Sequence, residues 1–294
     1  MANNNIPRPK VACEVSVERV VAARAADRAS ALESATAQNL PAGALLPGIQ
    51  QANLAARQPI VDALREALST VAGRSRDVVL IVPDATTRVM LLDFDTLPEK
   101  QEDAEGVVRF RLKKSLPFDI DQSAVAFDRQ KTAEGMRVIA AVTPRTVLQE
   151  YESAVLEAGY SPGTVMPSMI AALGAVDAAQ PTMVIKVESG TTTFAIVDGG
   201  QLLLYRALEN GGTAVTGESL VDDVNTSLVY FEDRYSVTVE RLLVSGVQSG
   251  QALQTAFSDR AVNVEELVPM ALAGAAASNV SRSALAGVAG ALVS

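Results

Sequence analysis

The chain has 294 residues, a formal net charge of −9, one cysteine, and neither histidine nor tryptophan. Without histidine it can form neither a Ser-His-Asp triad nor a histidine zinc site, and a single cysteine forms no internal disulfide or thiolate cluster. The acidic charge argues against a basic nucleic-acid-binding surface, so no nucleic-acid partner is expected.

Length and hydropathy predict two lobes in a protein of the cytoplasm. Domains typically hold about 100–150 residues, and 48% of this chain is apolar. No apolar run approaches the roughly 20 residues that a membrane-spanning helix needs. Residues 1–10 are polar and lack the apolar segment of a signal peptide.

The first half alternates predicted strands and helices. The apolar run over 77–83 is typical of a central strand covered on both faces, and Pro117 is expected to end a helix. Thr143 is a candidate N-cap and Gly159 a C-terminal glycine of one helix. The predicted elements are strands over 11–15, 19–25, 77–83, 88–94, 124–130 and 136–142, helices over 53–71, 99–116, 143–159 and 167–178, and a loop with one short strand over 27–48.

The predicted elements of the second half resemble those of the first, because both halves begin with a β-hairpin. Strands are predicted over 182–187, 192–197, 201–207 and 241–245, and helices over 218–235 and 251–257. The tail from Ser278 is rich in alanine, serine and glycine, and it is expected to be loosely ordered.

Three stretches carry a family resemblance. Residues 92–129 hold Leu97-Pro98 before a helix and Pro117-Phe118-Asp119-Ile120-Asp121 after it. Residues 188–202 read ESGTTTFAIVDGGQL, and residues 220–246 join a helix to a strand that ends in Ser245-Gly246. In this order and spacing the stretches resemble PilM, the actin-like protein of the type IV pilus assembly platform, and more distantly the cell-division protein FtsA.

The resemblance implies an α/β, actin-like (ribonuclease H-like) fold of two lobes with a small inserted α/β subdomain. The expected parts are residues 1–97 for the first part of lobe 1, 98–167 for the inserted subdomain, and 168–294 for the second lobe and a C-terminal return. Nucleotide would lie in the cleft between the lobes, held by two glycine-containing hairpin turns.

The turns depart from the Asp-x-Gly pattern of the family. The first aligns as Glu14-Val15-Ser16 and the second as Lys186-Val187-Glu188, while a third glycine site reads Gly246-Val247. Glycine lets backbone N–H groups approach a phosphate, and an acid positions Mg²⁺. The residues left to line a degenerate nucleotide cleft are Glu14, Ser16, Gly190, Thr191, Thr192 and Gly246.

The size of the charge repulsion, compared with a typical binding free energy, favours a cleft that does not hydrolyse ATP. Two like charges about 4 Å apart cost about 4 kcal/mol at an effective dielectric near 20. Glu188 facing a phosphate would therefore oppose about half of the roughly 8 kcal/mol that binds a micromolar ligand. No catalytic residue, metal ligand or cofactor is expected, although a weak ATP or Mg²⁺ contact through Ser16 or the threonine run stays open.

The resemblance implies that the partner is the N-terminal cytoplasmic segment of a PilN-like membrane protein. This segment would insert as an extended peptide between the first lobe and the small subdomain. The candidate pocket residues are Val108, Phe110, Leu112, Leu116 and Phe118. The alternative is that these side chains face the core of their own subdomain.

A basic cluster stands out on the same predicted helix in an acidic chain. Arg109, Arg111, Lys113 and Lys114 form either a solvated helix face or a docking patch for an acidic partner or membrane headgroups.

The favoured function is a cytoplasmic scaffold, peripheral to the inner membrane, that also contacts other pilus platform and motor proteins. The alternatives are an ATP-binding actin-like ATPase of pilus assembly and an FtsA-like protein of cell division. The tail 281–294 holds only Arg282 as a base and no aromatic residue, which argues against an FtsA-like membrane helix.

Overall fold

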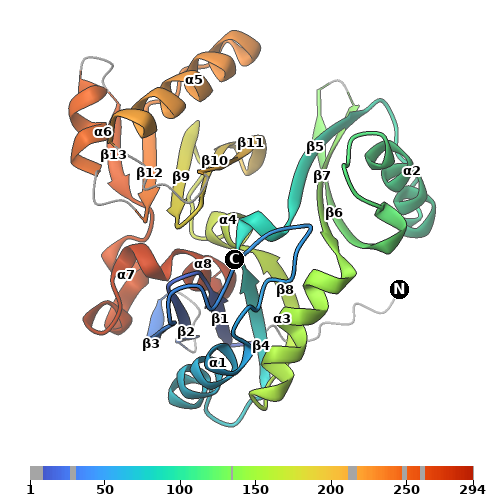
Figure 1. The fold of residues 1–294 in the computed structure, drawn as a ribbon. Helices are drawn as coiled ribbons and strands as arrows, with labels where there is room; N and C mark the ends of the chain where they lie inside the picture. The colour runs from blue at the N-terminus through green and yellow to red at the C-terminus, as the bar shows by residue number, and fades with distance from the viewer. Residues whose placement is uncertain are drawn as a thin grey trace.

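The computed structural model describes residues 9–26, 31–133, 135–210, 217–246, 250–258 and 262–293. Its strands form three sheets, which Figure 1 shows as two lobes and a smaller unit beside them. None of the helices in these described ranges is long and apolar enough to cross a membrane.

The first sheet is built around two strands buried on both faces, as the apolar runs predict. In sheet order its strands are β3 (Leu32–Asn39), β2 (Arg19–Ala25), β1 (Val11–Val15), β4 (Asp77–Val82) and β8 (Ser161–Pro167). Strand β1 pairs antiparallel with β2 and parallel with β4, which pairs parallel with β8. The sequence SPGTVMP of β8 gave no strand signal, because proline and glycine are poor β-formers.

Helices cover both faces of this sheet. On one face lie α1 (Arg57–Val71) and α3 (Arg145–Glu157), whose buried residues share a core with Cys13 and Leu80. On the other face lie α4 (Ser168–Leu173) and α8 (Ala286–Val293). The expectation of a loosely ordered tail is therefore wrong, since α8 is buried from Ala286 to Leu292. The N-cap prediction for Thr143 is also wrong, because Pro144 precedes α3 and the Thr143 hydroxyl hydrogen-bonds Thr87 at 2.8 Å.

The second sheet repeats the topology of the first. In sheet order its strands are β11 (Gln201–Glu209), β10 (Thr191–Asp198), β9 (Thr182–Glu188), β12 (Arg241–Ser245) and β13 (Asn263–Glu266). Again a three-stranded antiparallel meander joins two parallel strands. Helices α5 (Gly217–Tyr235) and α6 (Gly250–Ala256) lie on one side, α7 (Met270–Ala273) precedes the last turns, and α4 and α8 lie between the two sheets (Figure 1).

The smaller unit is a three-stranded antiparallel sheet with one helix. Its strands, in sheet order, are β5 (Arg88–Phe94), β7 (Gly135–Pro144) and β6 (Ser123–Thr132), and its helix is α2 (Gln101–Lys113). The pairing places its bounds at 88 and 144 instead of the expected 98 and 167. The reason is that β5 pairs with β7, whereas β8 pairs with β4 in the first lobe.

Candidate functional site

A buried ion-pair network lies where the two hairpins of the lobes meet. We call it the cleft cluster; its members are Glu14 of β1, Asp84 after β4, Ser168 at the start of α4, and Lys186 and Glu188 of β9. Glu14 and Lys186 are each only 5% exposed, although they lie far apart in the sequence. The cluster therefore joins the first lobe to the second.

The Lys186 ammonium is at the centre of the cluster. Its Nζ donates to Glu14 Oε1 at 3.0 Å, to Ser168 Oγ at 2.5 Å, and to the carboxylate of Glu188. These three contacts match the three N–H donors of an ammonium. The Ser168 hydroxyl in turn donates to Glu14.

Electrostatics keep Lys186 charged. Burial lowers its pKa, but the nearby carboxylates of Glu14, Glu188 and Asp84 more than offset this, so the pKa of Lys186 lies above its ordinary value. A protonated lysine here is a fixed positive charge between carboxylates.

Asp84 completes the cluster as a buried, hydrogen-bonded carboxyl. It accepts hydrogen bonds from the backbone N–H of Met169 at 2.9 Å and from Thr193 Oγ1 at 3.0 Å, and the Tyr205 hydroxyl lies 3.3 Å away. Burial, with the negative charge of Glu188, raises the pKa of Asp84 to about 7. Sequence reasoning missed Asp84 and Ser168. The available signal for Asp84 was a polar residue directly after a buried parallel strand.

The charged side chains of the cleft cluster are better arranged to pair with one another than to hold a metal–nucleotide complex. The ammonium stands between Glu14 and Glu188, so a divalent cation there would meet a like charge at contact distance. Among the described residues, no group of three or more acidic or cysteine side chains is arranged to hold a metal ion.

The remaining predicted cleft residues have structural partners. Ser16 donates its hydroxyl to its own turn, at Arg19 O, 2.9 Å away. Gly190 has φ of 90° in the β9–β10 turn, where a left-handed backbone favours glycine. Thr191 and Thr192 are buried in β10, and Thr192 Oγ1 accepts from Asn210 at 3.0 Å.

Gly246 is required by a close backbone approach. Its φ is 80°, and a Cβ added there would lie 1.8 Å from the carbonyl oxygen of Val187. Only glycine fits at this end of β12. Its predicted neighbour in the cleft, Val247, lies outside the described residues.

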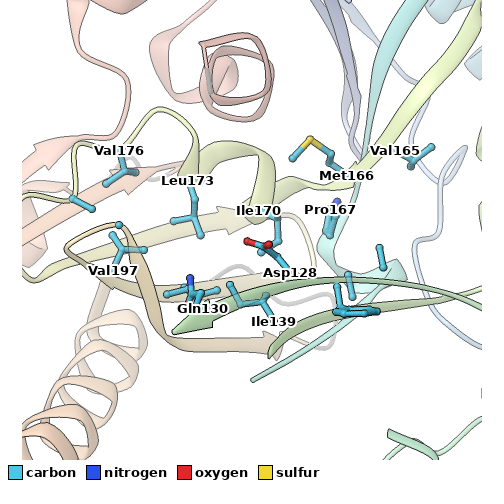
Figure 2. A pocket seen from close by; sticks show the side chains of 16 residues that line it. Asp128, Gln130, Ile139, Val165, Met166, Pro167, Ile170, Leu173, Val176 and Val197 are labelled. Atoms are coloured by element: carbon cyan, nitrogen blue, oxygen red, sulfur yellow. The ribbon is translucent and has the colours of Figure 1, made fainter. Parts of the chain in front are cut away.

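An apolar cavity of about 470 Å³ lies beside the cleft cluster. Its walls come from β6 and β7 of the small sheet, β8 and α4 of the first lobe, and the β10–β11 hairpin of the second. Figure 2 shows Ile139, Ile170, Leu173 and Val197 around this space. The cavity is thus bounded by all three sheets and is open to an apolar ligand or chain segment.

Two polar groups lie at the cavity wall on β6. Asp128 is exposed, and the side-chain oxygen Oε1 of Gln130 is buried without a hydrogen-bond partner. An unpartnered buried acceptor costs about 1–3 kcal/mol, so a donor brought by a ligand would be stabilised there.

The predicted partner residues lie elsewhere. Val108 and Leu112 are fully buried in the core between α2 and the small sheet, so they are core residues and not pocket residues. Leu116 and Phe118 are half-buried against the same core, and Phe110 is 67% exposed on the outer face of α2. None of the five lines the cavity. The cavity is lined instead by the face of β6 and β7 that is opposite to α2. The alternation of side chains along residues 124–130 and 136–142 could have indicated this second face.

Comparisons with known proteins place the fold. No protein-family model matches the chain, and neither does any curated protein. Among solved structures, the PilM–PilN type IV pilus biogenesis complex superposes with a TM-score of 0.77 and 18% identity, over 98% of this chain and 97% of that chain. A protein of Bacteroides thetaiotaomicron with an actin-like ATPase fold gives 0.56 and 10%, over 92% and 97%. The fold is actin-like.

A further structure with this actin-like architecture is the cytoplasmic domain of EpsL, an inner membrane component of the type II secretion system of Vibrio cholerae. It gives a TM-score of 0.56 and 9% identity, over 97% of this chain and 94% of that chain. The predicted two-lobed α/β fold with a smaller inserted unit is thus confirmed.

Proposed function

We propose that the chain is an adaptor of a type IV pilus assembly platform, and that its apolar cavity holds the N-terminal cytoplasmic segment of a PilN-like membrane protein. The cavity carries the proposal, because it lies where the first lobe and the small sheet meet the β10–β11 hairpin of the second lobe, and because its wall is apolar. The similarity to the PilM–PilN complex over nearly the whole of both chains supports it.

The cavity offers an extended peptide three kinds of contact. Apolar side chains of the peptide would pack against Ile139, Ile170 and Leu173. A backbone or side-chain N–H of the peptide would donate to Gln130 Oε1. Strand β6 is at the edge of its sheet, where an added strand can pair.

A peptide titration tests the proposal. Ala126 is exposed and lines the cavity, so Ala126→Trp would fill the space with little effect on folding. The matched control is Ala133→Trp, at an exposed turn position away from the cavity wall.

We expect the segment of the neighbouring PilN-like protein to bind the wild type and Ala133→Trp, and to bind Ala126→Trp at least about 10-fold more weakly. Equal affinity for the two variants, or no binding to the wild type, would contradict the proposal.

The proposal includes a cleft that does not use ATP. Lys186 already supplies the positive charge that Mg²⁺ would bring, and Glu188 would repel a phosphate. Isothermal titration with Mg·ATP should give no binding heat. Micromolar binding, or phosphate release that is lost in Glu14→Ala, would replace this reading by the ATPase alternative.

The adaptor would be held at the inner membrane by its partner. In cell fractionation we expect the protein in the membrane fraction when the PilN-like protein is present and in the cytoplasm when its N-terminal segment is deleted. Other platform or motor proteins would then be recovered with the membrane-bound form only.

A further inference from the structure

Exposed apolar side chains gather on two helices of the described chain. Eight large apolar side chains are exposed among the described residues, and Val107 and Phe110 of α2 and Val229 and Tyr230 of α5 are four of them. Phe110 is 67% and Tyr230 56% exposed. Paired exposed apolar groups on a helix face indicate a contact surface, whereas scattered single ones do not.

The first surface, the α2 stripe, is apolar and basic. It comprises Val107, Phe110, Arg111 and Lys114, which follow the i, i+3, i+4, i+7 spacing of one helix face. All four are exposed, and the Lys114 ammonium lies 5.2 Å from the centre of the Phe110 ring.

The positive charge of the α2 stripe is not neutralised within the described chain. Arg109 pairs with Glu105, and Lys113 pairs with Asp121. Arg111 and Lys114 form no ion pair with any described residue. Two cations beside an exposed phenylalanine are thus available to a partner.

The second surface, the α5 stripe, is apolar and acidic. It comprises Asp222, Thr226, Val229, Tyr230 and Asp233, at spacings of i, i+4, i+7, i+8 and i+11. All five are exposed, while Leu220, Val224 and Phe231 on the opposite side of α5 are buried. Within the described chain neither aspartate forms an ion pair.

We propose that the α2 stripe of one molecule docks on the α5 stripe of a second copy of this chain. The charges are complementary: Arg111 and Lys114 would face Asp222 and Asp233, while Phe110 would pack beside Val229 and Tyr230. Figure 1 shows α2 on the outer side of the small sheet and α5 on the outside of the second lobe.

The two stripes differ, so the contact is head-to-tail. After two molecules pair, one still has a free α2 stripe and the other a free α5 stripe, and such a contact builds open chains or rings instead of a symmetric dimer. Two single helix faces bury less than the roughly 1,200–2,000 Å² of a stable interface, so association is weak and depends on concentration.

Sedimentation velocity on the full chain tests the proposal. At concentrations up to about 200 µM, we expect the average mass to rise past that of a dimer in low salt and to fall in about 0.5 M NaCl, because charge pairs are screened. A monomer at every concentration, or association that stops at a dimer, would overturn it.

Two variants each block one stripe. Phe110→Glu disables the α2 stripe and Tyr230→Arg the α5 stripe, and each alone is expected to weaken self-association at least about 10-fold. Leu156→Glu, at an exposed site on α3 outside both stripes, is the matched control and should behave as the wild type.

Mixing the two variants gives the decisive readout. Phe110→Glu retains the α5 stripe and Tyr230→Arg retains the α2 stripe, so their mixture should form a one-to-one dimer and nothing larger. This result also shows that both variants are folded. A mixture that stays monomeric, although both variants unfold cooperatively, would overturn the proposal.

Two further measurements distinguish self-docking from peptide binding in the cavity and from binding to a membrane surface. Both variants should still bind the PilN-like segment in the cavity, since neither residue lines it. A monomeric wild type that pellets with anionic lipid vesicles, while Phe110→Glu does not, would assign the α2 stripe to a membrane surface and overturn self-docking.

Discussion

The cleft cluster and the apolar cavity both lie where the second lobe meets the first, yet they differ in what fills them. In the cleft cluster, Lys186 satisfies its donors on Glu14, Ser168 and Glu188. In the cavity, apolar walls surround open space and Gln130 Oε1 has no partner. A junction whose polar groups are hydrogen-bonded to one another stabilises the fold. A junction with open apolar space and an unpartnered acceptor is available for binding.

The largest effect is expected when the Lys186 ammonium is removed, because this ammonium neutralises the carboxylates of the cleft cluster. Lys186→Met leaves the Glu14 and Glu188 carboxylates buried without a counter-charge, and we expect the free energy of unfolding to fall by about 3–5 kcal/mol. Urea denaturation measures it.

The control for this prediction is Lys113→Met. Lys113 pairs with Asp121 at the surface, so its loss should cost less than about 1 kcal/mol. Adding Glu14→Gln and Glu188→Gln to Lys186→Met should restore most of the lost stability. Equal stability of Lys186→Met and the wild type would mean that the cluster does not hold the lobes together.

The second prediction compares two glycines expected to line the cleft. Gly246→Ala should cost about 3 kcal/mol or more, because a left-handed backbone and a clash with Val187 act together. Gly190→Ala meets no atom within 4 Å and should cost only about 1 kcal/mol of backbone strain.

Thermal unfolding of the two glycine variants gives the comparison. If both variants lost the same stability, the close approach at Gly246 would not be the reason for that glycine.

The third prediction concerns pH and Asp84. Its pKa is about 7 in the folded protein and about 4 when unfolded, so the folded state binds more protons between these values. The contribution of Asp84 to the free energy of unfolding is therefore fullest below pH about 4 and is lost as pH rises through 7.

Asp84→Asn removes this dependence and keeps polar contacts to Met169 and Thr193. Relative to the wild type, the variant should gain about 1–3 kcal/mol between pH 5 and pH 8. Denaturation at the two pH values checks it, and a constant difference between the proteins would contradict the shifted pKa.

The smallest effect is expected in the cavity, where Gln130 Oε1 has no hydrogen-bond partner. Gln130→Leu removes the unpartnered oxygen, so the free protein should become about 1 kcal/mol more stable while its affinity for the PilN-like segment falls several-fold. The exposed Gln122→Leu is the control and should change neither quantity by much. A loss of stability in Gln130→Leu would show that its oxygen is satisfied in the free protein.

Local patterns predicted much of the fold, because several elements carry their signal in adjacent residues. Strands β1, β2, β5 and β12 were predicted with the bounds observed, since their apolar runs are continuous or alternate. Strand β8 was missed, because its pairing with β4 outweighs its proline and glycine content. Helix α8 was missed for a similar reason: its glycines weaken helix propensity, yet Gly290 permits close contact with Ala171 of α4.

The candidate site shows where sequence reasoning stopped. The charge reversal at Lys186 and Glu188 was visible in the second turn, but its partner Glu14 lies 172 residues away, a contact that only the fold creates. In the smaller unit, Val108 and Leu112 of α2 follow helical periodicity, and periodicity alone does not say which apolar face of a helix a neighbouring sheet covers. The cavity instead uses the other face of that sheet, together with elements from both lobes.

The position of α8 constrains how the protein is made. Strand β1 is among the first residues described and α8 among the last, yet they pack together, and Gly287 lies directly against the Glu14 carboxylate. On a ribosome the first lobe therefore cannot finish folding until residue 293 has emerged. During synthesis its inner sheet face stays exposed, and this interval is when a chaperone would be most needed.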